Sequence, residues 1–214
     1  MFLFMLVLLP AVLFYCCLRS TDKSVISVAM TGAVSGVFVS ACTALFTYLH
    51  RIPELSFAGN TFYYFFKEYF IPVILLYAVY SLVISDEKEY KVKTFFPLML
   101  AFYAVYMPYR VIASNSGAFS LFSIFVKPVL VLCMLIYLAK FNFVFYKANL
   151  GKNSKYQVAA VLLALVSMLI PACLEGMYTV FFAVPLVYVV SLLYAGFSVF
   201  VFLRQVREED SFLL

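Results

Sequence analysis

Apolar residues occupy long, nearly uninterrupted stretches of this chain, and polar residues gather in short clusters between them. A helix needs about 20 mainly apolar residues to cross roughly 30 Å of hydrocarbon. Seven stretches have about this length: residues 2–18, 24–49, 61–85, 94–113, 119–139, 156–174 and 177–203. The pattern therefore predicts seven transmembrane helices, whose backbone groups are hydrogen-bonded within each segment.

The composition supports the same fold class. Hydrophobic residues make up 66% of the 214 residues and charged residues only 12%, about half of the charged share of a soluble domain, so a soluble globular protein is excluded. Runs such as 158–166 are apolar at every position instead of alternating with period two, which excludes a membrane β-barrel. No Lys or Arg precedes the first stretch, so we expect it to remain as a helix rather than to act as a signal peptide. The prediction is an all-α, polytopic membrane protein.

The distribution of Lys and Arg predicts the orientation in the membrane. With the N-terminus outside and the C-terminus in the cytoplasm, the outer loops contain only Arg51. The cytoplasmic side then contains Arg19, Lys23, Lys88, Lys91, Lys93, Lys140, Lys147, Lys152, Lys155, Arg204 and Arg207. We expect residues 1–203 to form one transmembrane domain in the cell membrane, surrounded by lipid, and residues 204–214 a short cytoplasmic tail.

Several kinds of function are unlikely on the residues alone. The net charge of +5 is spread over several loops, so it indicates topology and not a nucleic-acid patch. His50 is the only histidine, so a multi-histidine zinc site is excluded, and no glycine-rich phosphate loop is present. We expect no metal and no cofactor. The small residues Gly32, Gly36 and Ser40, four apart, predict a flat helix face that packs closely against another helix of the same chain.

Five ionisable residues lie inside or at the edge of the predicted spans. A charge near the bilayer centre costs about 3 kcal/mol, so such residues are expected to face the protein interior or a water-filled cavity. All five fall in the outer half of the predicted topology: Lys67, Glu68, Arg110, Lys127 and Glu175. The outer loop adds His50, Arg51 and Glu54. Two interpretations remain open: an ion-paired network that holds the helices together, and a polar cavity that opens to the outside.

The order of these features resembles the PrsW family of intramembrane proteases, which is related to the glutamate-dependent CPBP membrane proteases. The family's Glu-Glu-x-x-Lys motif resembles residues 65–71, which contain Lys67 and Glu68 and precede the charged loop at 86–89. Its Glu-Asn pair, after a small and aromatic run, resembles 101–104 and the following Tyr109-Arg110. Its later His-Gly-Leu-Tyr-Asn segment is similar to residues 175–179, which begin with Glu175-Gly176.

The chain departs from the family at the positions that carry catalysis. By this comparison Glu68 keeps the identity of the second catalytic glutamate. Other identities stand at Lys67, Ile71, Arg110, Lys127 and Glu175, where the family has Glu, Lys, Asn or Glu, His and His. Peptide hydrolysis needs a base that activates water and a group that stabilises the oxyanion. An adjacent Lys67 would tend to hold Glu68 as an unreactive ion pair.

The resemblance therefore implies a degenerate relative, a pseudoprotease whose outer cavity binds a membrane segment, a peptide or a partner subunit, such as a single-span membrane protein. An active peptidase with altered chemistry is a first alternative. Its candidate catalytic residues are Glu68 as base, with Arg110, Lys127 and Glu175, and its candidate binding residues are Lys67, His50, Arg51 and Glu54. A small transporter or channel for an anionic solute is a second alternative, which the absence of a visible inverted repeat disfavours.

Overall fold

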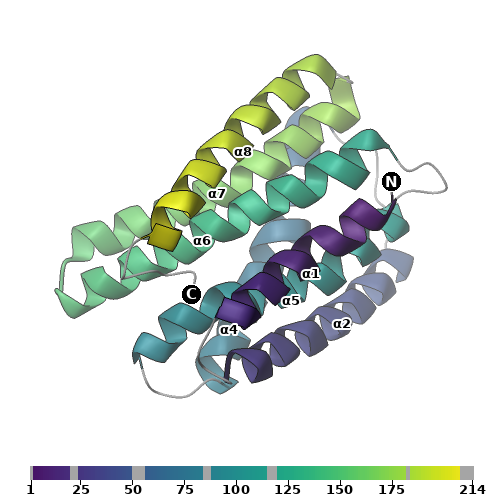
Figure 1. The fold of residues 1–214 in the computed structure, drawn as a ribbon. Helices are drawn as coiled ribbons and strands as arrows, with labels where there is room; N and C mark the ends of the chain where they lie inside the picture. The colour runs from purple at the N-terminus through teal and green to yellow at the C-terminus, as the bar shows by residue number, and fades with distance from the viewer. Residues whose placement is uncertain are drawn as a thin grey trace.

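A computed structural model describes residues 2–19, 24–49, 56–83, 88–114, 120–181 and 184–207. Every secondary-structure element in these ranges is a helix (Figure 1). The elements are α1 (Phe2–Arg19), α2 (Ser24–Leu49), α3 (Phe57–Tyr64), η1 (Phe65–Phe70), α4 (Ile71–Val83), α5 (Lys88–Ser114), η2 (Phe122–Val126), α6 (Lys127–Leu150), α7 (Ser154–Phe181) and α8 (Val184–Arg207). The two η elements are short π-helices that continue directly into α4 and α6.

Within the described ranges, six helical segments are long and apolar enough to cross a membrane. They are Val25–Leu45, Phe57–Leu82, Thr94–Ala113, Phe122–Leu150, Ser154–Phe181 and Pro185–Arg204. Helix α1 contributes a shorter apolar stretch, Leu6–Leu18. The chain is thus an all-helical, multi-pass membrane protein.

Several helix ends differ from the predicted ones. Helix α3 begins at Phe57 instead of 61, α5 at Lys88 instead of 94, and α8 at Val184 instead of 177. The predicted break between 174 and 177 is wrong, because α7 continues through Glu175 and Gly176 to Phe181. Glu175 is held by ion pairing inside the helix bundle, so this charge does not mark the end of a span. Helix α6 also extends beyond the predicted end at 139 to Leu150, which places Lys140 and Lys147 on helix rather than loop.

Helix α5 lies at the centre of the bundle. Figure 1 shows α6, α7 and α8 side by side in one half of the molecule, with α1, α2 and α5 in the other, and α5 contacts α1, α2 and α6. From Thr94 to Tyr103 every α5 side chain is buried. A helix that is apolar all round is expected in this position, because it has no face for water or lipid.

The small-residue face of α2 packs against α5 as predicted. A Cβ atom added to Gly32 would collide with the Leu98 carbonyl oxygen. At Gly36 it would lie 2.8 Å from the Phe102 carbonyl oxygen. The Ser40 hydroxyl is satisfied within its own helix, donating to the Gly36 carbonyl at 2.7 Å. Close backbone approach of this kind is the use that small residues have in membrane helices.

Candidate functional site

Four of the predicted intramembrane charges meet in one cluster. Glu68 comes from η1, Arg110 from α5, Lys127 from the first residue of α6 and Glu175 from α7. Arg110 Nη2 lies 2.5 Å from Glu68 Oε1, and Lys127 Nζ lies 2.6 Å from both Glu68 Oε2 and Glu175 Oε1. Both interpretations of these charges placed them away from lipid, and the structure brings four of the five together in an ion-paired network. We call these four residues the ionic cluster.

The ionic cluster is buried and balanced in charge. The exposed fractions of its residues are 2% for Glu68, 4% for Lys127, 5% for Arg110 and 8% for Glu175. Two cations face two anions, and the remaining oxygen of Glu175 accepts a hydrogen bond of 3.2 Å from the Tyr69 hydroxyl. Buried ions are tolerated when each one is paired and its remaining polar atoms are hydrogen-bonded. The pairing thus offsets much of the cost of taking these charges out of water.

The π-helix η1 turns two consecutive side chains toward the core. Glu68 and Tyr69 are both buried, and the buried face continues through Pro72, Val73 and Leu76. The Ile71 N–H donates to the Phe66 carbonyl, five residues earlier, instead of the Lys67 carbonyl four residues earlier. Such bulges are rare and occur often at functional sites. In this chain the bulge orients the glutamate of the ionic cluster.

Tyrosines of α5 bind the carbonyl groups that the bulge leaves free. Pro72 has no N–H and cannot donate to the Glu68 carbonyl four residues earlier. The Tyr103 hydroxyl donates to that carbonyl at 3.2 Å, and the Tyr106 hydroxyl donates to the Lys67 carbonyl at 3.2 Å. Backbone groups without such partners would be costly in a membrane. The tyrosines therefore stabilise the irregular backbone next to the ionic cluster.

A second π-helix stands directly before Lys127. The Lys127 N–H donates to the Phe122 carbonyl, five residues earlier, and Pro128 follows at the second position of α6. Because η2 continues directly into α6, Pro128 lies inside a continuous helix, where its missing N–H removes one backbone hydrogen bond. Both η1 and η2 thus end two residues before a proline, and each carries or adjoins one member of the ionic cluster.

Very little space remains inside the ionic cluster. Three of its residues, Glu68, Arg110 and Lys127, line a cavity of about 10 Å³ together with Tyr69, Tyr103, Tyr106, Met107 and Val131. This is close to the minimum that holds a single water molecule. Among the buried side-chain polar atoms described, Arg110 Nε and Thr61 Oγ1 have no hydrogen-bond partner.

The other predicted site residues fall elsewhere. The ammonium of Lys67 contacts the Tyr63 hydroxyl and lies 4.7 Å from the centre of the Tyr63 ring. Lys67 is half-buried and touches the cluster's surroundings through its backbone carbonyl. His50, Arg51 and Glu54 lie outside the described residues.

Sequence reasoning missed the three tyrosines that surround the ionic cluster, Tyr69, Tyr103 and Tyr106. A signal was available for two of them. Tyr103, Tyr106 and Arg110 follow the spacing i, i+3 and i+7, which places them on one face of a helix. No equivalent signal marks Tyr69, because its inward orientation depends on the π-helix.

The chemistry that this arrangement permits is limited. Each carboxylate oxygen of Glu68 accepts a hydrogen bond from a cation, and the Lys127 ammonium is shared by both glutamates.

The next buried polar pair of α4 and α5 is Tyr80 with Thr94, whose hydroxyl oxygens lie 3.2 Å apart. Between this pair and the ionic cluster, α5 presents a buried apolar stretch, Phe95–Phe102.

Comparisons with protein-family models, with curated proteins and with solved structures returned no match to this chain.

Proposed function

We propose that this protein is a non-catalytic, PrsW-like membrane protein whose ionic cluster holds α5, α6, α7 and the η1 region together, so that the bundle can bind a partner in the membrane. The observation that carries the proposal is the double pairing of Glu68. Its two oxygens lie 2.5 Å from Arg110 and 2.6 Å from Lys127. A carboxylate held in this way serves as structural counter-ion to both cations.

Catalysis would require a different geometry. A general base must be within hydrogen-bond reach of the proton that it removes, directly or through one water. Stabilising donors must also lie about 3 Å from the position of the developing oxyanion. A volume of about 10 Å³ has no room for a peptide bond and its attacking water. The pairing of Arg110 and Lys127 equally leaves no unneutralised cation in the ionic cluster to attract an anionic solute.

The proposed arrangement in the cell membrane has seven spans, with the N-terminus outside and the C-terminus in the cytoplasm. Helix α1 is the seventh span: its 18 residues extend about 27 Å, close to the thickness of the hydrocarbon core. Its Leu9 and Cys16 side chains are buried against the bundle. This topology puts the ionic cluster in the outer half and most lysines in the cytoplasm. An N-terminal epitope accessible from outside intact cells tests it, and an inaccessible epitope contradicts it.

The partner that we propose is a single-span membrane protein or another subunit. Helix α8 supports this choice, because it carries large apolar side chains turned away from the bundle. Leu192, Leu193, Phe197 and Phe200 are all at least 64% exposed. Gly196 lies among them, and a Cβ added there would meet nothing within 4 Å. Small residues on such a face permit close approach of a second helix.

The test of the non-catalytic assignment is a cleavage assay. Purified protein is incubated in lipid with candidate single-span substrates, beside the variants Glu68→Gln and Glu87→Gln. Glu87 is the control, since it belongs to the predicted cytoplasmic loop and not to the ionic cluster. We expect no cleavage by any of the three proteins. Cleavage that is lost in Glu68→Gln and retained in Glu87→Gln would overturn the proposal and establish the peptidase.

A further inference from the structure

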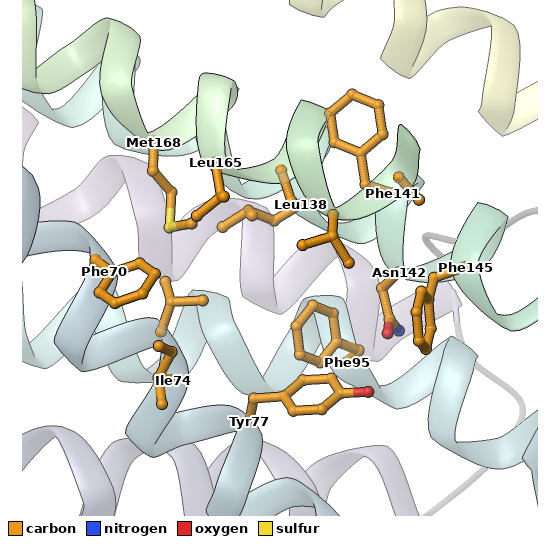
Figure 2. A pocket seen from close by; sticks show the side chains of 14 residues that line it. Phe70, Ile74, Tyr77, Phe95, Leu138, Phe141, Asn142, Phe145, Leu165 and Met168 are labelled. Carbon is orange, nitrogen blue, oxygen red and sulfur yellow. The ribbon is translucent and has the colours of Figure 1, made fainter. Parts of the chain in front are cut away.

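A large apolar groove opens between α4, α5, α6 and α7. It has a volume of about 480 Å³, within the range of small-molecule sites. Helix α4 supplies Ile74 and Tyr77, α6 supplies Leu138 and Phe145, and α7 supplies residues from Ala160 to Met168. Figure 2 shows these side chains lining one continuous space. We call this space the α4–α7 groove.

The α4–α7 groove extends from Phe70 of η1, two residues from Glu68, into the half of the membrane opposite to the ionic cluster. On α7 it begins at Ala160, near the cytoplasmic start of the helix, and ends at Met168, before Glu175. Eight residues of helix correspond to about 12 Å. One leaflet of a bilayer with a core of roughly 30 Å contributes about 15 Å of hydrocarbon. The groove therefore spans most of the cytoplasmic leaflet in the proposed topology.

The cytoplasmic end of the α4–α7 groove is polar, and basic residues lie at the adjoining ends of α6 and α7. Figure 2 shows the Asn142 amide and the hydroxyl of Tyr77 toward the same end of the space, beside Phe145. Three exposed lysines belong to the helix ends and the turn at this level, Lys147, Lys152 and Lys155, and residues 140–160 contain no acidic residue. Basic sites between helices on the cytoplasmic side attract anionic lipid headgroups.

We propose that the α4–α7 groove binds one acyl chain of an anionic glycerophospholipid from the cytoplasmic leaflet. The apolar walls contact the chain, Asn142 and Tyr77 face its ester region, and the lysines attract its headgroup. This inference rests on the orientation given under the proposed function. The proposed site takes a lipid of defined charge from the cytoplasmic leaflet, whereas the ionic cluster is buried at the level of the outer leaflet.

A single tryptophan can report on the groove, because the chain contains none. Ile74→Trp places the probe at the groove edge, where Ile74 is 48% exposed. Val34→Trp is the control on α2, since Val34 is 67% exposed and does not line the groove. Ile74 lies nine residues before the cytoplasmic end of α4, and Val34 lies ten residues after the cytoplasmic start of α2. Each variant is reconstituted in phosphatidylcholine vesicles that contain a small fraction of a lipid with brominated acyl chains, which quench tryptophan fluorescence. The brominated lipid is phosphatidylglycerol in one set of vesicles and phosphatidylcholine in the other, and the ratio of quenching between the two sets is measured.

The expected result is stronger quenching by the brominated anionic lipid at Ile74→Trp only. One favourable contact between a lysine and the headgroup gives a preference of about fivefold over the neutral lipid, and the Val34→Trp protein should show a ratio near one. Adding Ala164→Phe, which fills the groove, should lower the ratio to that of the control. Adding Ala159→Phe, on an exposed face of α7, should leave it unchanged.

Equal ratios at both tryptophans, or a ratio that Ala164→Phe does not change, would overturn the lipid site. Elution of each variant as a single species in size-exclusion chromatography shows that the protein is folded. The cleavage assay and the epitope assay give independent results. A missing lipid preference with an outside N-terminus therefore contradicts only the groove, whereas an inaccessible N-terminus contradicts the orientation.

Discussion

Lys127 is the centre of the ionic cluster, and its replacement by methionine is the most informative perturbation. Methionine keeps an unbranched chain of similar length but removes the ammonium that bridges Glu68 and Glu175. At an effective dielectric constant of about 20, two unit charges 2.6 Å apart attract each other by roughly 6 kcal/mol. Desolvation offsets part of this attraction, and removing one partner of a buried ion pair typically costs about 3 to 5 kcal/mol.

The cost arises mainly from the glutamates that remain. Without Lys127, Glu175 keeps only the hydrogen bond from Tyr69 and carries a buried, uncompensated charge. The double variant Lys127→Met with Glu175→Gln removes that charge and leaves the pair of Arg110 and Glu68 intact. We expect the double variant to regain at least about 2 kcal/mol of the loss, in the range of coupling energies for directly contacting groups.

The assay is denaturation by SDS in mixed micelles, followed by circular dichroism, for the wild type, both single variants and the double variant. The interaction free energy from this cycle separates the ion pair from general packing. A loss below about 1 kcal/mol in Lys127→Met, the median worth of an exposed salt bridge, would refute the buried network. A double variant no more stable than Lys127→Met would refute the role of Glu175 in it.

Three further predictions use the same denaturation assay. Tyr103→Phe should lower the free energy of unfolding by about 1 kcal/mol, because the Glu68 carbonyl loses its donor. The loss should be smaller in a Pro72→Ala background, which restores a backbone N–H, and equal losses in both backgrounds would contradict the pairing. Gly36→Ala should lower the free energy of unfolding by about 1 to 3 kcal/mol, because the new Cβ would lie 2.8 Å from a backbone oxygen of α5. The control Gly196→Ala, with open space around the new Cβ, should raise it by up to about 1 kcal/mol. Gly176→Ala should also destabilise the protein, since the new Cβ would lie 2.5 Å from Thr61 Oγ1. Adding Thr61→Ala should restore the lost stability, because this buried oxygen has no hydrogen-bond partner to lose. A double variant no more stable than Gly176→Ala would contradict the contact with Thr61.

The inward placement of the charges could be predicted from the sequence, because lipid penalises each of them, whereas their meeting in one cluster is a finding of the structure. The face of Gly32 and Gly36 could be predicted for a similar reason, since lack of side chains on one helical stripe has a use only at a close crossing. Both predictions depend on solvent and spacing alone. Neither requires knowledge of the partner helix.

The details of the ionic cluster depend on features that residue spacing does not encode. The two π-helices change which side chains face inward, so regular helical periodicity misplaces Tyr69 relative to Glu68. The continuation of α7 through Glu175 was also missed, because a Glu-Gly pair between apolar runs looks like a turn until its contacts are known. Gly176 lies against Thr61 and Glu175 against Lys127, and these tertiary contacts override the local signal.

The prolines explain why charges can be assembled here without breaking the bundle. Each member of the ionic cluster lies within four residues of a proline: Pro72, Pro108, Pro128 or Pro171. A proline removes one backbone donor and forces the preceding turn to adjust, as η1 and η2 do before Pro72 and Pro128. The freed carbonyls of η1 then bind tyrosine hydroxyls of α5. Irregular backbone and charge thus stabilise each other in a region where neither would be stable against lipid.

The proposed resemblance to the PrsW family sets these contacts beside the residues of that family's catalytic site. On that comparison, Arg110 and Lys127 stand where the family has Asn or Glu and His. Both are long cations, and two cations are what two buried glutamates require for neutrality. A cavity of about 10 Å³ remains beside Glu68. The pairing of Glu68 with both cations therefore favours a structural role for this carboxylate over the role of a free base.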